Sequence, residues 1–127
     1  MKKETENWLK ISRNDLRVAE TLFKEGLYLN VIEHGHAALE KLMKGVLVEQ
    51  DKTPPKIHNL LKLVSLALIE NAQKEIENTL EELDDLYFST RYPQDFDYIQ
   101  QLLPKEKVNS FLKQIKEIYK LLEKNIQ

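Results

Sequence analysis

The sequence contains no cysteine. This absence excludes disulfide frameworks, thiolate-ligated zinc or iron–sulfur sites, and cysteine nucleophiles. Long apolar runs are also missing, because no uncharged stretch approaches the ~20 apolar residues that a membrane-spanning helix needs. Neither sign of charge dominates, since 19 Lys and Arg oppose 21 Asp and Glu, which argues against a wholly basic nucleic-acid binder but still allows a local basic face. We therefore expect a soluble, cytoplasmic protein without a bound cofactor and without a membrane partner.

Glycine and proline are scarce, with three and four residues, and their positions mark breaks between helices. Between these breaks the chain is rich in Leu, Lys and Glu, and apolar residues recur at steps of three and four. No segment alternates with period two, so no sheet is expected. The pattern predicts helices over residues 5–25, 29–50, 58–70 and 72–88, and a last helix that begins near residue 104. We expect an all-α, antiparallel up-and-down bundle of four to five helices, with residues 1–127 in a single domain.

Three histidines are present, and two of them lie close together in the sequence. His34 and His36 point roughly 200° apart on a helix, so they cannot share one metal ion. Glu33 and His36 form a single Glu-x-x-His pair, whereas a di-metal bundle needs one on each of two helices. We expect both histidines to lie at a surface or an interface, and we predict no metal site.

Two segments carry side chains that suit ligand binding. Glu40 and Lys44 form an i,i+4 pair in the favourable order, which is typical of a solvated helix face and also compatible with a site. The connection over residues 89–103 is longer than most bundle loops, and in it Arg91 is followed by the aromatic Tyr92. Arginine holds a phosphate bidentately while neighbouring rings stack on bases. The alternative is that Arg91 only ties this loop to the acidic helix before it.

These segments resemble the HEPN family, the nucleotide-binding domain of higher eukaryotes and prokaryotes. The residues that carry the resemblance occur in order along nearly the whole chain: Asp15-Leu16, Ala19, Leu22, Gly26 and Tyr28; Ala37-x-x-Glu40-Lys41-x-x-Lys44; His58-x-Leu60; and Thr90-Arg91-Tyr92-Pro93. The resemblance implies a helical bundle that is commonly a homodimer. It also implies a minimal nucleotidyltransferase as partner, in a toxin–antitoxin or substrate-binding pair.

The sequence departs from the family at the ribonuclease motif. Ribonuclease members carry an arginine followed after four to six residues by a histidine, but the corresponding positions after Arg91 are Phe96, Asp97 and Tyr98. RNA cleavage needs a proton acceptor with a pKa near neutrality, which histidine supplies. In some toxin members a tyrosine two residues after that histidine is modified with AMP by the partner, and Tyr98 keeps this spacing.

Three functions follow from these observations. The chain is a nucleotide- or RNA-binding module that works with a nucleotidyltransferase, an active metal-independent ribonuclease with a displaced base such as His58, or a purely structural bundle. We favour the first and name as candidate nucleotide- or RNA-binding residues Arg91, Tyr92, Tyr98, His58 and Lys44, with no catalytic or metal-ligating residue.

Apolar residues outside the helical stripes favour a homodimer. The residues that the stripes leave over include Tyr28, Leu29, Val48 and Ile99. Exposed apolar surface of more than a few hundred Å² usually marks an interface. We therefore expect these residues to contribute to contact with a second copy of the chain.

Overall fold

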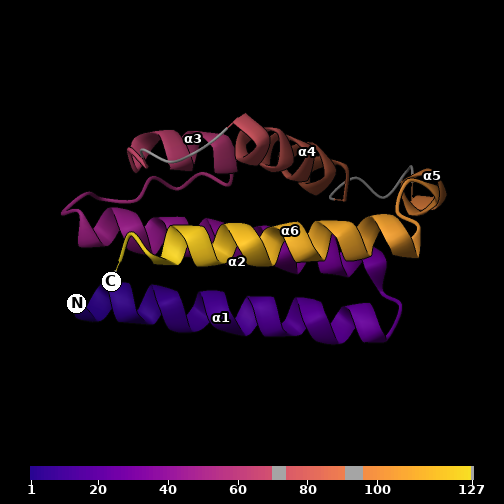
Figure 1. Ribbon diagram of the computed structural model, residues 1–127, viewed down its shortest axis with the longest axis horizontal. Helices are drawn as coiled ribbons and strands as arrows, with labels where there is room; N and C mark the ends of the chain where they lie inside the picture. The colour runs from indigo at the N-terminus through magenta and orange to yellow at the C-terminus, as the bar shows by residue number, and fades with distance from the viewer. Residues whose placement is uncertain (70–73, 91–95, 127) are drawn as a thin grey trace.

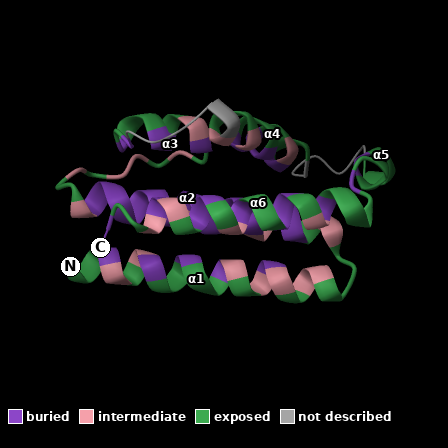
Figure 2. Ribbon diagram, viewed as in Figure 1, coloured by how far each residue is buried: buried purple, intermediate pink, exposed green. Residues whose placement is uncertain are grey.

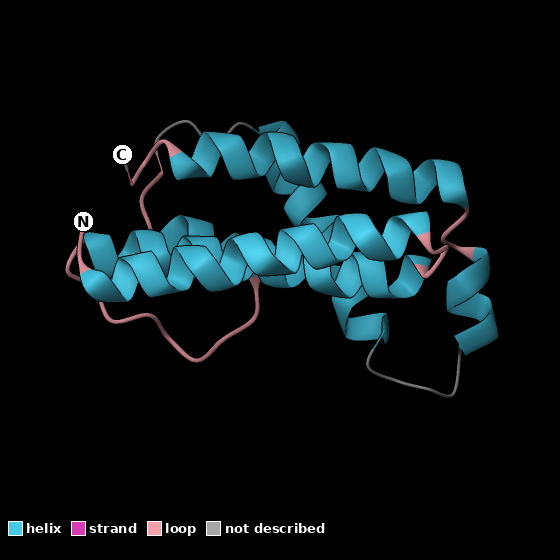
Figure 3. Cartoon of the chain, turned by 90° about the horizontal axis from the view of Figure 1, so that it is seen from below, coloured by secondary structure: helices cyan, strands magenta, loops and turns pink. Residues whose placement is uncertain are grey.

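A computed structural model describes residues 1–69, 74–90 and 96–126, and over these residues it contains helices and no strand (Figures 1 and 3). The helices are α1 (Lys3–Lys24), α2 (Tyr28–Glu49), α3 (Leu60–Leu66), α4 (Lys74–Thr90), α5 (Phe96–Gln101) and α6 (Lys105–Glu123). The prediction of an all-α bundle is confirmed. The described part has one helix more than the four to five expected, because Phe96–Gln101 form a short helix inside the predicted connection.

The three long helices α1, α2 and α6 run lengthwise beside one another (Figure 1). Helices α3 and α4 follow each other along the other side of α2, and α5 lies at one end of the bundle (Figure 1). The turn between α1 and α2 is tight because Gly26 adopts a φ of 75°, a left-handed conformation that favours glycine. This turn makes α1 and α2 antiparallel neighbours.

Helix α2 is the central element, since it packs against each of the other five helices. Fourteen of its 22 residues are buried (Figure 2). Two glycines let neighbouring helices approach closely. A Cβ added at Gly35 would lie 2.7 Å from Ile115 Cδ1 of α6, and one added at Gly45 would lie 3.1 Å from Trp8 Cβ of α1. Side chains on α2 therefore lie against neighbouring helices, which hold them in place.

The apolar residues left exposed by the fold differ from those expected from the sequence. Tyr28 and Leu29 are half-buried, but Val48 and Ile99 are buried, so the expectation of exposure is wrong for these two. The start of α1 covers the last turn of α2, where Lys2 Nζ donates to the Val48 carbonyl oxygen, and the unexpected α5 turns Ile99 into the core. The exposed large apolar residues at α5 and the α1–α2 turn are instead Leu27, Phe96, Tyr98 and Leu102, and Phe88 is exposed near the end of α4.

A buried hydrogen-bond network ties α1, α2 and α6 together. The Ser12 hydroxyl donates to the Ala38 carbonyl oxygen at 2.6 Å and is hydrogen-bonded at 3.0 Å to the Tyr119 hydroxyl. Tyr119 is only 4% exposed, and burial raises the pKa of its hydroxyl above the usual value near 10.

We predict that Tyr119 makes the protein less stable in alkali. Above about pH 10 the unfolded chain ionises Tyr119 while the folded chain keeps its hydroxyl protonated, so the free energy of unfolding falls as the pH rises. Urea unfolding at about pH 8 and about pH 11 should show a smaller loss of stability in Tyr119→Phe than in the wild type. Tyr98→Phe is the control, because that ring is exposed on α5. An equal alkaline loss in all three proteins would contradict the prediction.

Candidate functional site

A buried carboxylate on α2 holds two basic side chains. Glu40 Oε1 lies 2.9 Å from His58 Nδ1, and Glu40 Oε2 accepts a hydrogen bond from Lys44 Nζ at 3.1 Å. The structure thus brings together His58 and Lys44, two of the candidate residues, through a third residue of the family-like stretch. We refer to Glu40, Lys44 and His58 as the Glu40 cluster.

The interpretation of Glu40 and Lys44 as a solvated helix face is wrong. Glu40 is 7% exposed and Lys44 is 8% exposed. The Trp8 ring of α1 lies near Lys44, with its centroid 5.9 Å from Nζ, and His58 lies over Glu40. A buried ion pair of this kind costs desolvation energy that a surface pair does not, so it contributes little net stability.

The structure separates the two neighbouring histidines, as their spacing predicts. His34 Nδ1 lies 3.1 Å from Asp15 Oδ1 of α1, beside Lys41, which contacts the other oxygen of the same carboxylate. His36 faces α4, where its Nε2 donates to Asp84 Oδ1 at 2.9 Å. The expectation that His36 lies at a surface or interface is wrong, since its side chain is fully buried.

Tyr87 of α4 connects His36 with the Glu40 cluster. Its ring stacks on the His36 ring at 4.0 Å with an interplanar angle of 14°. The same ring lies 5.9 Å from the His58 ring, tilted by 40°. Among the residues that the structure describes, His36 Nδ1 has no hydrogen-bond partner, and the ring is held by its contact with Asp84 on one edge and by stacking on its face.

Asp84 positions His58 through the start of α3. Its carboxylate accepts the backbone N–H groups of Leu60, at 2.9 and 3.1 Å, and of Leu61, at 3.3 Å. Asn59, the N-cap residue, accepts the N–H of Lys62 at 2.8 Å. The first three N–H groups of α3 are therefore satisfied, and His58 is fixed two residues before that helix.

The arrangement of the Glu40 cluster suits proton or phosphate chemistry. A carboxylate only accepts hydrogen bonds, so His58 Nδ1 donates to Glu40 and leaves Nε2 on a side chain that is 54% exposed. Among the described residues, no three His, Cys, Asp or Glu side chains are placed to hold a metal ion. Over the same residues, no helix combines the length and apolar character needed to cross a membrane.

The other three candidate residues are placed differently. Arg91 and Tyr92 lie outside the described residues, directly after the last residue of α4. Tyr98 is exposed on α5, which packs near the start of α2, whereas Lys44 lies about four turns further along α2. At about 1.5 Å per residue these positions are roughly 20 Å apart along the helix.

Sequence reasoning missed Trp8, Asp84 and Tyr87. Asp84 is hard to recognise because its segment is rich in acidic residues. It nevertheless lies four residues after Leu80 and three before Tyr87, which is the spacing of the buried face of α4. That spacing is the available signal, because an acid on an apolar stripe is buried and must be hydrogen-bonded.

In this all-helical domain, a buried carboxylate holds one buried lysine and one half-exposed histidine. The family model described as "HEPN domain" matches residues 5–125, so the chain belongs to the HEPN family. The crystal structure of TT1696 from Thermus thermophilus is similar, with a TM-score of 0.82 over 98% of this chain and 99% of that chain. The two sequences are 21% identical, so the likeness shows the fold. Comparison with curated proteins finds no match.

We predict that Asp84→Ala destabilises the protein by about 2–4 kcal/mol, because it leaves buried N–H donors of α3 and His36 without their acceptor. Urea unfolding measures this loss. The matched control is Asp85→Ala on the next, exposed residue, which should change stability by no more than about 0.5 kcal/mol. Equal effects of the two substitutions would show that the Asp84 carboxylate does not fix α3.

Proposed function

We propose that the protein is a single HEPN domain that binds the phosphate of a nucleotide or an RNA at the Glu40 cluster, with Arg91 as a second phosphate ligand. In this proposal it works as a homodimer with a minimal nucleotidyltransferase, in a toxin–antitoxin-like pair, and does not itself cleave RNA. The proposal extends to Tyr92 as a stacking ring and to Tyr98 as the residue that the partner modifies.

The observation that carries the proposal is the shared carboxylate of Glu40. It holds Lys44 and His58, which come from different segments, in fixed positions before any ligand arrives. Side chains ordered in advance lose little conformational entropy on binding. A ligand phosphate can supply a further negative charge beside Lys44 and His58.

Arg91 fits the same proposal from its place in the sequence. It follows Tyr87 by four residues, and Tyr87 lies beside His58. A guanidinium binds phosphate in a planar, two-point contact that lysine does not reproduce.

We predict that Arg91→Ala raises the dissociation constant for AMP or a short RNA at least about tenfold and changes the unfolding free energy little. His58→Ala should raise the dissociation constant by a smaller factor, because the imidazole offers the phosphate one contact where the guanidinium offers two. Titration calorimetry at about 50 and about 200 mM salt measures both, and binding should weaken with salt.

Arg13→Ala is the control for Arg91→Ala, since Arg13 is an exposed arginine that pairs with Glu123 of α6. It should leave binding unchanged. If Arg91→Ala unfolds the protein and the wild type binds neither AMP nor RNA, Arg91 is a structural tie and the proposal fails.

A second function is favoured by one specific contact, that between Glu40 and His58. A carboxylate on Nδ1 fixes the tautomer and orientation of a histidine so that Nε2 can accept a proton, as a general base requires. With Arg91 on the phosphate, this pair could support metal-independent cleavage of RNA.

The two functions differ in what happens to RNA. Under our proposal, RNA incubated with the purified protein stays intact on a denaturing gel. Cleavage that persists with a chelator, and that is lost in both His58→Ala and Glu40→Gln, would instead establish the ribonuclease. Cleavage that survives both substitutions is contamination or another site.

A further inference from the structure

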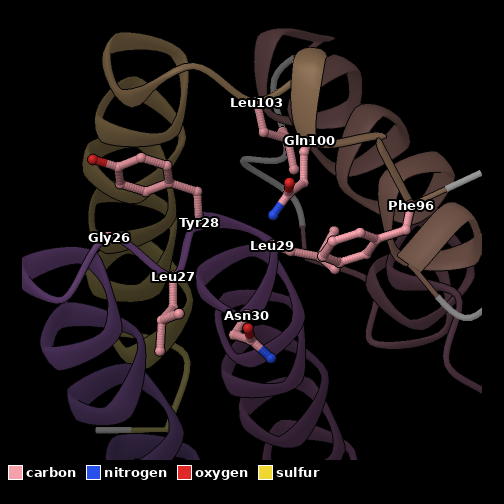
Figure 4. A pocket seen from close by; sticks show the side chains of 8 residues that line it. All are labelled: Gly26, Leu27, Tyr28, Leu29, Asn30, Phe96, Gln100 and Leu103. Atoms are coloured by element: carbon pink, nitrogen blue, oxygen red, sulfur yellow. The ribbon is translucent and has the colours of Figure 1, made fainter. Parts of the chain in front are cut away.

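A cavity of about 410 Å³ lies between the α1–α2 turn and α5, away from the Glu40 cluster (Figure 4). Its lining residues are Gly26, Leu27, Tyr28, Leu29, Asn30, Phe96, Gln100 and Leu103. The volume falls in the lower part of the 300–1,000 Å³ range typical of small-molecule sites. A ligand of nucleoside size fits this volume better than a dinucleotide does.

The walls of the cavity are mostly apolar and include the exposed aromatic ring of Phe96. Leu27 and Leu29 come from the start of α2, and Phe96 extends from α5 toward Leu29 (Figure 4). Phe96 is 47% exposed and Leu27 is 49% exposed, so about half of each residue remains accessible to a ligand. An exposed phenylalanine face is a stacking surface for a planar ring.

The polar groups of the cavity are uncharged. Gln100 extends its carboxamide from α5 toward the start of α2, and Asn30 adds a second carboxamide at the rim (Figure 4). None of the eight lining residues carries a charge. A carboxamide presents one donor and one acceptor side by side, the pattern with which Gln and Asn pair with the N6 and N7 edge of adenine.

We propose that this cavity binds the base of a purine nucleoside, stacked on Phe96 and hydrogen-bonded by Gln100. Phe96 and Gln100 are four residues apart on α5, so they lie on the same side of this short helix, and Leu103 lines the cavity from just beyond its end. Tyr98 lies between them in the sequence and does not line the cavity. The inference does not rest on phosphate binding, because a nucleoside has no phosphate.

The test is calorimetric titration of the full chain with adenosine, and with uridine for comparison. Adenosine should bind at one saturable site and more tightly than uridine. Phe96→Leu keeps the apolar wall and removes the ring, and Gln100→Leu keeps the volume and removes the polar edge. Each should raise the dissociation constant about tenfold.

Two variants serve as controls, and thermal melts establish that all the proteins fold. Tyr98→Leu alters the same helix outside the cavity and should leave adenosine binding unchanged. Arg91→Ala should do the same, which separates this site from the phosphate site. If a short oligoadenylate displaces adenosine, the natural ligand is a purine base of an RNA strand. If it does not, the natural ligand is a free nucleoside. Both outcomes support a purine site.

Three results would overturn the proposal. The first is no adenosine binding at millimolar concentration. The second is binding that Phe96→Leu and Gln100→Leu leave unchanged. The third is sedimentation showing that Phe96→Leu dissociates a dimer while adenosine has no effect, which would make the cavity a contact between copies of the chain. None of these results bears on whether AMP or RNA binds at the Glu40 cluster.

Discussion

The structure depends on the enclosure of α2. Because this helix packs against all five others, most of its side chains meet a neighbouring helix, and its buried polar residues need partners. Gly35 and Gly45 allow the close approach of α6 and α1, since a Cβ at Gly35 would force Ile115 to shift and one at Gly45 would crowd Trp8. The apolar positions supply the core, and the remaining positions become sites where polar groups are held in fixed geometry.

The polar groups on α2 are divided between its two sides. Asp15 of α1 holds His34 and Lys41. On the other side, His36 contacts Asp84 of α4 and Glu40 contacts His58 just before α3, while Lys44 pairs with Glu40 close to Trp8 of α1. On both sides each contact pairs a carboxylate with a basic side chain, as burial requires. The second side differs because His58 keeps one edge accessible, which is why we place ligand binding there.

Much of the fold could be predicted from the sequence because the information is local. Apolar spacing, Gly26 and the prolines locate the long helices within a few residues of their observed bounds. The short α5 was not predicted, because six residues between a proline-containing stretch and Pro104 carry too few turns to show a helical period.

The candidate site was predictable only in part. Family-like spacing identified Lys44 and His58, and the structure places them on one carboxylate. The burial of Lys44 and His36 could not be foreseen, because the rings beside them, Trp8 and Tyr87, belong to helices far away in the sequence. Which face of α2 each of those helices covers is a tertiary property that i,i+4 spacing does not encode.

The capping of α3 has a consequence for the order in which the chain folds. Seven residues are too few to form a helix in water, because nucleation costs more than the few hydrogen bonds return. Two of the first three amides of α3 depend on Asp84, which lies 24 residues after Leu60 in the chain. The α1–α2 hairpin can assemble from contacts close in sequence, whereas α3 becomes stable only after α4 has docked on α2. We therefore expect His58, two residues before α3, to be among the last groups to reach its place.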